Sequence, residues 1–136
     1  MSSIYSEIIL DYYRYPRNKG QLSSPQIKAK DSNPLCGDVV EIQIELDSDS
    51  HVKDVRFNGQ GCAISQASAS MLTELVKGKN LDEVRKISKD DIFSLIGGQL
   101  SVVRVKCALL SLKVLKTGLY TYLGSLDSSK DELASL

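Results

Sequence analysis

The stretch Gly59-Gln60-Gly61-Cys62-Ala63-Ile64-Ser65 constrains this chain more than any other part of its sequence. A β-favouring run with Val52, Val55 and Phe57 precedes it, and a helix-like run of small residues follows it. Two glycines at such a junction permit a tight turn and a close approach of the backbone to its neighbours. Cys62 then lies at or beside the first helical turn, where unpaired N–H groups carry partial positive charge. That position favours the thiolate, which is the form of cysteine that binds metals or attacks sulfur.

The remaining patterns predict one α+β domain with a small antiparallel sheet. Apolar spacing and stop signals predict helices over residues 3–15, 62–77, 81–87, 89–96 and from 101 or 105 to 117. Alternating residues predict strands at 39–46 and 52–58, joined by a turn at 47–50, and a weaker pattern predicts an edge strand at 26–31. We expect the domain to cover residues 1–118, with residues 119–136 as a tail or loose terminal helix.

Two of these segments predict which surfaces are buried. The strand at 39–46 separates an apolar face from a polar face that we expect to be wet: Val40, Ile42, Ile44 and Leu46 against Glu41, Gln43 and Glu45. The last helix is apolar around most of its circumference, so it should be well buried. Its expected solvent stripe consists of Lys106, Lys113 and Lys116.

Charge and cysteine usage narrow the function classes. The 17 basic and 17 acidic side chains cancel, so no overall field favours nucleic acid or an anionic membrane as a partner. No signal peptide and no apolar run of transmembrane length is recognisable, and we expect a cytoplasmic protein. In a reducing cytosol, three cysteines are more often buried, metal-binding or catalytic than disulfide-bonded.

Cys36, Cys62 and Cys107 each lie at an element boundary beside glycine or basic residues, so we expect them to meet at one site. The alternative is that they are three small core residues, because free cysteine is often buried. Asp38 follows Cys36 by two positions, and on an extended segment both side chains point the same way. Three thiolates and one carboxylate suit tetrahedral zinc or iron–sulfur ligation. Arg104 and Lys106 would offset part of their negative charge.

Other chemistries are disfavoured. The single histidine, His51, lies at a predicted hairpin tip, and neither the serines of the small-residue helix nor the cysteines have a nearby histidine as a general base. Gly59 and Gly61 lack the third glycine and the βαβ context of a dinucleotide loop. The sequence therefore favours a metal or sulfur site over a hydrolase or a nucleotide-binding enzyme.

Four segments, in order along the chain to about residue 118, resemble the IscU/SufU/NifU-N family of iron–sulfur cluster assembly scaffolds. They are Asp11-Tyr12-Tyr13-Arg14-Tyr15-Pro16-Arg17-Asn18, Asn33-Pro34-Leu35-Cys36-Gly37-Asp38, Gly59 to Ser70, and Arg104-Val105-Lys106-Cys107-Ala108. The resemblance implies a three-stranded antiparallel sheet with helices packed on one face. It also implies a cluster or zinc site on Cys36, Asp38, Cys62 and Cys107.

The resemblance further implies a scaffold or carrier, not an enzyme. Such a protein takes sulfur from a cysteine desulfurase, binds iron, assembles a [2Fe–2S] cluster and transfers it to apo iron–sulfur proteins, with an iron donor or chaperone as further partners. Cys107 or Cys62 would accept the persulfide. Two alternatives remain open: a zinc-dependent sulfurtransferase that relays persulfide, and a structural zinc domain. Lys106 stands where the housekeeping scaffolds carry histidine, and the insertion typical of SufU-type members is absent.

Overall fold

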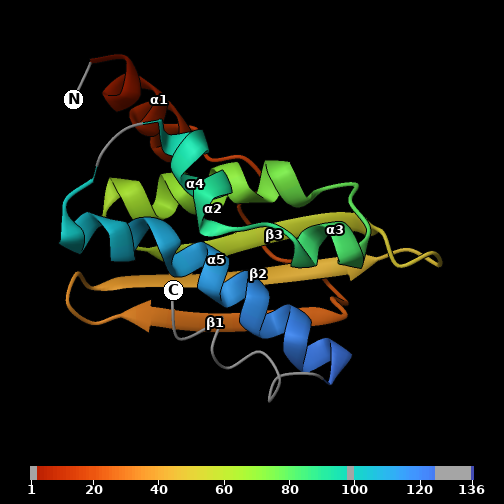
Figure 1. Ribbon diagram of the computed structural model, residues 1–136. Helices are drawn as coiled ribbons and strands as arrows, with labels where there is room; N and C mark the ends of the chain where they lie inside the picture. The colour runs from red at the N-terminus through yellow and green to blue at the C-terminus, as the bar shows by residue number, and fades with distance from the viewer. Residues whose placement is uncertain (1–2, 98–99, 125–135) are drawn as a thin grey trace.

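The computed structural model describes residues 3–97, 100–124 and 136. Its base is an antiparallel sheet in the order β1-β2-β3 (Figure 1). The strands are β1 (Ile27–Asn33), β2 (Asp38–Leu46) and β3 (Val52–Gln60). The helices are α1 (Ser3–Arg14), α2 (Ala63–Val76), α3 (Leu81–Arg85), α4 (Lys89–Ile96) and α5 (Val102–Leu123). This confirms the predicted α+β class and its three-stranded antiparallel sheet.

Helices α2 and α5 lie over the same face of the sheet (Figure 1), where the alternating apolar residues of β2 and β3 form the core with them. Helix α1 packs against α2, away from the sheet. Tyr12 Oη donates to Glu74 Oε1 at 2.7 Å, and the Arg17 guanidinium lies 3.9 Å from the centre of the Tyr12 ring. Ser88 and Asp91 form the capping box expected at the start of α4, and Gly97 ends that helix in the left-handed conformation.

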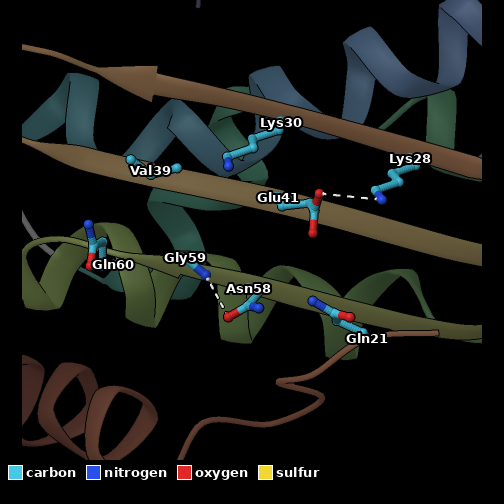
Figure 2. A pocket seen from close by; sticks show the side chains of 8 residues that line it. All are labelled: Gln21, Lys28, Lys30, Val39, Glu41, Asn58, Gly59 and Gln60. Atoms are coloured by element: carbon cyan, nitrogen blue, oxygen red, sulfur yellow. Dashed lines mark hydrogen bonds and ion pairs between the residues drawn. The ribbon is translucent and has the colours of Figure 1, made fainter.

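The opposite face of the sheet is polar but only partly wet. The chain after α1 first pairs with the outer edge of β3, where Gly20 N donates to Phe57 O. It then crosses the polar face, where Leu22 N donates to the Gln43 side chain on β2. Gln43 is therefore buried, which corrects the prediction that its whole face is exposed to water. Beyond this crossing, Lys28, Lys30, Glu41 and Asn58 line a polar hollow of about 500 Å³ (Figure 2).

Helix α5 is longer than predicted and differs in its solvent face. Gly118, one residue beyond the predicted end at 117, lies inside the helix, where a Cβ would come within 3.0 Å of Ile27 and 3.1 Å of Ala29. The missing side chain lets α5 approach β1 closely, and Gly124 caps the helix instead. The predicted tail falls mostly on residues 125–135, outside the described residues, so the domain boundary at 118 stays a prediction.

Lys116 does not belong to the predicted solvent stripe. It is buried, and its Nζ donates to Arg85 O at the end of α3. The short helix α3 packs over this part of α5, and its terminal carbonyl offers the ammonium group an acceptor. Lys106 is exposed, and Lys113 is half-exposed, 3.7 Å from Asp31. Across the described residues, no helix combines the length and hydropathy that a membrane span requires.

Candidate metal centre

The three cysteines and Asp38 lie where four elements meet at one end of the sheet. Cys36 is in the turn between β1 and β2, and Asp38 is the first residue of β2. Cys62 is the N-cap of α2, with extended backbone angles, and Cys107 lies in the second turn of α5. The four side chains are therefore supplied by a turn, a strand and two helices, from three segments that are far apart in the sequence.

Cys36, Asp38 and Cys107 form a compact group. One ligand atom from each lies within 4.8 Å of the other two, and the Cys107 thiol donates to Cys36 Sγ at 3.1 Å. All three cysteines of the chain are free. Asp38 and Cys107 are fully buried, whereas Cys36 is partly exposed. The group therefore forms a site that opens to solvent on the side of the β1–β2 turn.

Cys62 joins this group through Asp38. Its Sγ lies 3.8 Å from Asp38 Oδ2, and its backbone N–H donates to Asp38 Oδ1 at 2.8 Å. The sulfur also accepts the Ser65 backbone N–H at 3.4 Å, so it caps the first turn of α2. The structure thus brings together all four residues expected at one site, although Cys62 lies outside the most compact trio. Their role as ligands stays a prediction.

Gly59 and Gly61 permit the close backbone approach on which this geometry depends. A Cβ at Gly61 would overlap Asp38 Oδ1, and a Cβ at Gly59 would overlap Val39 O. Both glycines also have positive φ angles, of 145° and 152° respectively. The carboxylate of Asp38 can reach the Cys62 amide only because Gly61 carries no side chain, whereas Gly59 lets the backbone of β3 pass close to Val39 on β2.

Burial raises the pKa of the Cys107 thiol, and hydrogen bonding with Cys36 and Asp38 raises it further. In the metal-free protein this thiol is therefore neutral near pH 7, and metal binding must displace its proton. Coulombic attraction to the sulfur of Cys62, and then to that of Cys107, once these thiols are ionised, raises the pKa of the exposed Arg104 guanidinium. Arg104 is thus the cation that faces the sulfurs.

Lys106, the second predicted supporting cation, has a different neighbour. Its Nζ donates to Leu136 O at 3.2 Å, beside a hollow lined by Leu35, Leu110 and Lys113. Because this bond points the ammonium group at the chain's last residue, Arg104 is better placed to balance negative charge on the sulfurs. The supporting role of both residues stays a prediction.

The donor set fits zinc or an iron–sulfur cluster. Zinc–sulfur bonds of about 2.3 Å in a tetrahedron place two sulfurs roughly 3.8 Å apart. The Cys36 and Cys107 sulfurs, at 3.1 Å, need only separate slightly to reach that spacing. Of the two predicted persulfide acceptors, Cys62 is partly exposed and Cys107 is buried.

The sequence patterns did not reveal Ser65 and Gln66 as part of this site. Ser65 is fully buried, its Oγ donates to Cys62 O at 3.1 Å, and Gln66 Nε2 donates to Ser65 Oγ at 3.1 Å. One sequence feature could have indicated Ser65: it lies three residues after Cys62, the N-cap residue, and this is the spacing of a capping box. No sequence pattern indicated the contact of Gln66.

The model of the NifU-like N terminal domain family matches residues 4–128. The zinc-dependent sulfurtransferase SufU of Bacillus subtilis strain 168 is 38% identical, over 87% of this chain and 90% of its own. The iron–sulfur cluster assembly scaffold protein IscU of Haemophilus influenzae is 36% identical, over 87% and 94%. A solved structure of a putative iron–sulfur cluster assembly scaffold protein for the SUF system, from Fervidobacterium islandicum AW-1, has a TM-score of 0.75 and 31% identity, over 86% of this chain and 97% of that one.

Proposed function

This chain belongs to the NifU-like N-terminal domain family, and from that membership we propose that it is an iron–sulfur cluster assembly scaffold. It receives sulfur from a cysteine desulfurase, binds iron, assembles a [2Fe–2S] cluster as its cargo and transfers the cluster to apo-proteins. We propose that it works in the cytoplasm. The observation that carries the proposal is the grouping of Cys36, Asp38 and Cys107 within 4.8 Å, with Cys62 on the same carboxylate.

The ligand set suits a cargo that must leave again. Thiolates hold iron–sulfur clusters firmly, whereas a carboxylate is a harder and weaker ligand for them. Cys36 and Cys62 are partly exposed, so the site is open to an incoming sulfur donor and to an acceptor protein. One oxygen ligand among three sulfurs, close to the surface, therefore supports assembly followed by release.

Sulfur delivery requires one thiolate of the site. Cys62 or Cys107 attacks the outer sulfur of the desulfurase persulfide, a new S–S bond forms, the old S–S bond breaks and the desulfurase thiolate leaves. Conversion of this bound sulfur to sulfide takes two electrons from an external thiol or protein reductant. Cys62 is the more exposed of the two candidates and lies at the positive end of α2.

Anaerobic reconstitution tests the proposal. Metal-free protein receives a cysteine desulfurase, cysteine, a reductant and Fe²⁺, and the visible absorption of a cluster is followed. We expect a chromophore that requires Cys36, Cys62 and Cys107 and that passes to an apo-ferredoxin. No chromophore with the native protein, under conditions where an established scaffold forms one, would overturn the proposal.

A zinc-dependent sulfurtransferase is the second candidate, and two observations favour it. The Bacillus subtilis relative carries that name, and the position before Cys107 is held by a lysine that bonds elsewhere. In this reading the same residues hold zinc, which keeps the thiolates in place until one is freed for attack on a persulfide. Stoichiometric zinc that iron cannot displace, with sulfur transfer that persists without iron, would decide for this candidate.

A further inference from the structure

Gln66 is a buried amide beside the candidate site, with 6% of its surface exposed. Its Nε2 donates in two directions, to Val39 O on β2 at 3.4 Å and to Ser65 Oγ on α2 at 3.1 Å. Val39 is the residue after Asp38, so the amide bridges the start of the strand and the start of the helix. These are the two segments that carry Asp38 and Cys62.

Ser65 extends this bridge to Cys62 itself. The Ser65 hydroxyl donates to Cys62 O at 3.1 Å, while its backbone N–H donates to Cys62 Sγ at 3.4 Å. Together with the bond from the Cys62 amide to Asp38, these contacts close a ring. The Cys62 turn is therefore fastened to β2 twice, once through the Asp38 carboxylate and once through the Gln66 amide.

The oxygen of the same amide argues against a role in core packing alone. Gln66 Oε1 is buried and has no hydrogen-bond partner among the described residues. A buried polar atom without a partner carries a desolvation cost, which an apolar side chain of similar volume such as methionine would avoid. The amide is thus poorly satisfied as a core group, and its contribution lies in the two bonds of Nε2.

We infer that Gln66 is a positioning residue that holds the Cys62 turn against β2 in parallel with Asp38. The consequence is that Cys62 keeps its place when the Asp38 carboxylate turns toward a metal or is displaced from it. The importance of this for cluster chemistry rests on the proposed function, but the positioning itself can be measured in metal-free protein.

The test compares Gln66→Met with Thr73→Val. Thr73 is a matched control, because it is also buried on α2, donates to Ser70 O at 2.6 Å and lies far along the helix from Cys62. Amide hydrogen exchange at Cys62 is measured by NMR, and chemical denaturation gives the overall stability. We expect Gln66→Met to speed exchange at Cys62 by at least roughly threefold, because it removes both hydrogen bonds of Nε2. Its denaturation midpoint should fall no further than that of Thr73→Val.

Two further variants keep the outcome decisive. Ser65→Ala should also speed exchange at Cys62, since it removes the link between the amide and the turn. In an Asp38→Ala background the Cys62 amide has lost its acceptor, so exchange is measured at the Ser65 amide, which donates to Cys62 Sγ. There Gln66→Met should have a larger effect than in the Asp38-containing protein, because the second tether then holds the turn without the first. Equal exchange at Cys62 in Gln66→Met and Thr73→Val would overturn the inference.

A metal readout separates this inference from the proposed function. Cobalt(II), a spectroscopic probe of thiolate sites, is titrated into the native protein and into Gln66→Met. Weaker cobalt binding by Gln66→Met supports the inference. Equal affinities and equal thiolate absorption bands would refute it while leaving the metal site intact, whereas failure of the native protein to bind cobalt, zinc or iron would refute the proposed function.

Discussion

Asp38 contacts Cys62 with both carboxylate oxygens: Oδ1 accepts the Cys62 backbone N–H at 2.8 Å, and Oδ2 lies 3.8 Å from Cys62 Sγ. One buried side chain thereby orients the turn that carries a candidate ligand and stands ready to be a ligand itself. Substitutions at Asp38 can separate these two tasks, because asparagine retains an oxygen acceptor and alanine retains none.

Asp38→Ala should slow the release of a reconstituted cluster, because the weak oxygen ligand is replaced by a better one or water is excluded. Asp38→Asn should leave amide exchange at Cys62 close to native, whereas Asp38→Ala should accelerate it. Transfer to an apo-ferredoxin measures release. Transfer from Asp38→Ala at the native rate or faster would remove Asp38 from the release step.

Gly61→Ala should destabilise the protein by about 1–3 kcal/mol or more, because the new Cβ overlaps Asp38 Oδ1 and the backbone has a positive φ. Gly78→Ala is the control, since Gly78 has a φ of 89° but open space around its Cα. It therefore reports backbone strain without a clash. Denaturation of both variants gives the difference, and equal losses of stability would show that the Asp38 contact adds nothing.

Arg104→Gln should weaken metal binding several-fold at low ionic strength, because this guanidinium faces the sulfurs of Cys62 and Cys107. Lys106→Gln is the matched control and should change affinity less, since Lys106 bonds to Leu136 O. Competition with a chromogenic zinc chelator measures both. The effect of Arg104→Gln should shrink as salt is raised, and an effect unaffected by salt would argue against its electrostatic origin.

In the metal-free protein, Cys107 should react with iodoacetamide more slowly than Cys36 and Cys62. It is fully buried, and burial raises its pKa, so little thiolate is present at pH 7–8. Peptide mass spectrometry after timed alkylation resolves the three sites. Modification of all three at one rate would mean that the site is open in solution.

The raised pKa of Cys107 also predicts how stability depends on pH. Above pH 9.0, the ordinary pKa of cysteine, the thiol of the unfolded chain loses its proton while the folded Cys107 keeps its own. The folded state therefore binds more protons than the unfolded state in this range. The free energy of unfolding of the metal-free protein should therefore fall as the pH rises through this range. Cys107→Ser, which does not titrate there, should show a smaller fall in denaturation measured at pH 8 and pH 10.

Short-range sequence patterns were sufficient to predict much of the secondary structure of this protein. Alternation in 39–46 and 52–58 predicted β2 and β3, and the glycines beside Cys62 indicated a junction with a close approach. Ser88 and Gly97 marked the ends of α4. These features depend on interactions within a few residues, which is why sequence alone determines them. The positions of Cys36 in a turn and of Cys62 at the start of α2 were predicted in the same way, whereas Cys107, expected at an element boundary, lies inside α5.

Contacts between distant segments decided the rest. Lys116 is buried because α3 presents a terminal carbonyl to it, and Gly118 continues α5 because β1 lies directly beneath. Gln43 is covered by a segment from another part of the chain, and Arg104 rather than Lys106 faces the sulfurs. Helical period and charge spacing describe which side chains share a face, but the neighbour that covers each face is set by packing. The sequence therefore determined which residues could form the site, and only tertiary packing decided which of them meet.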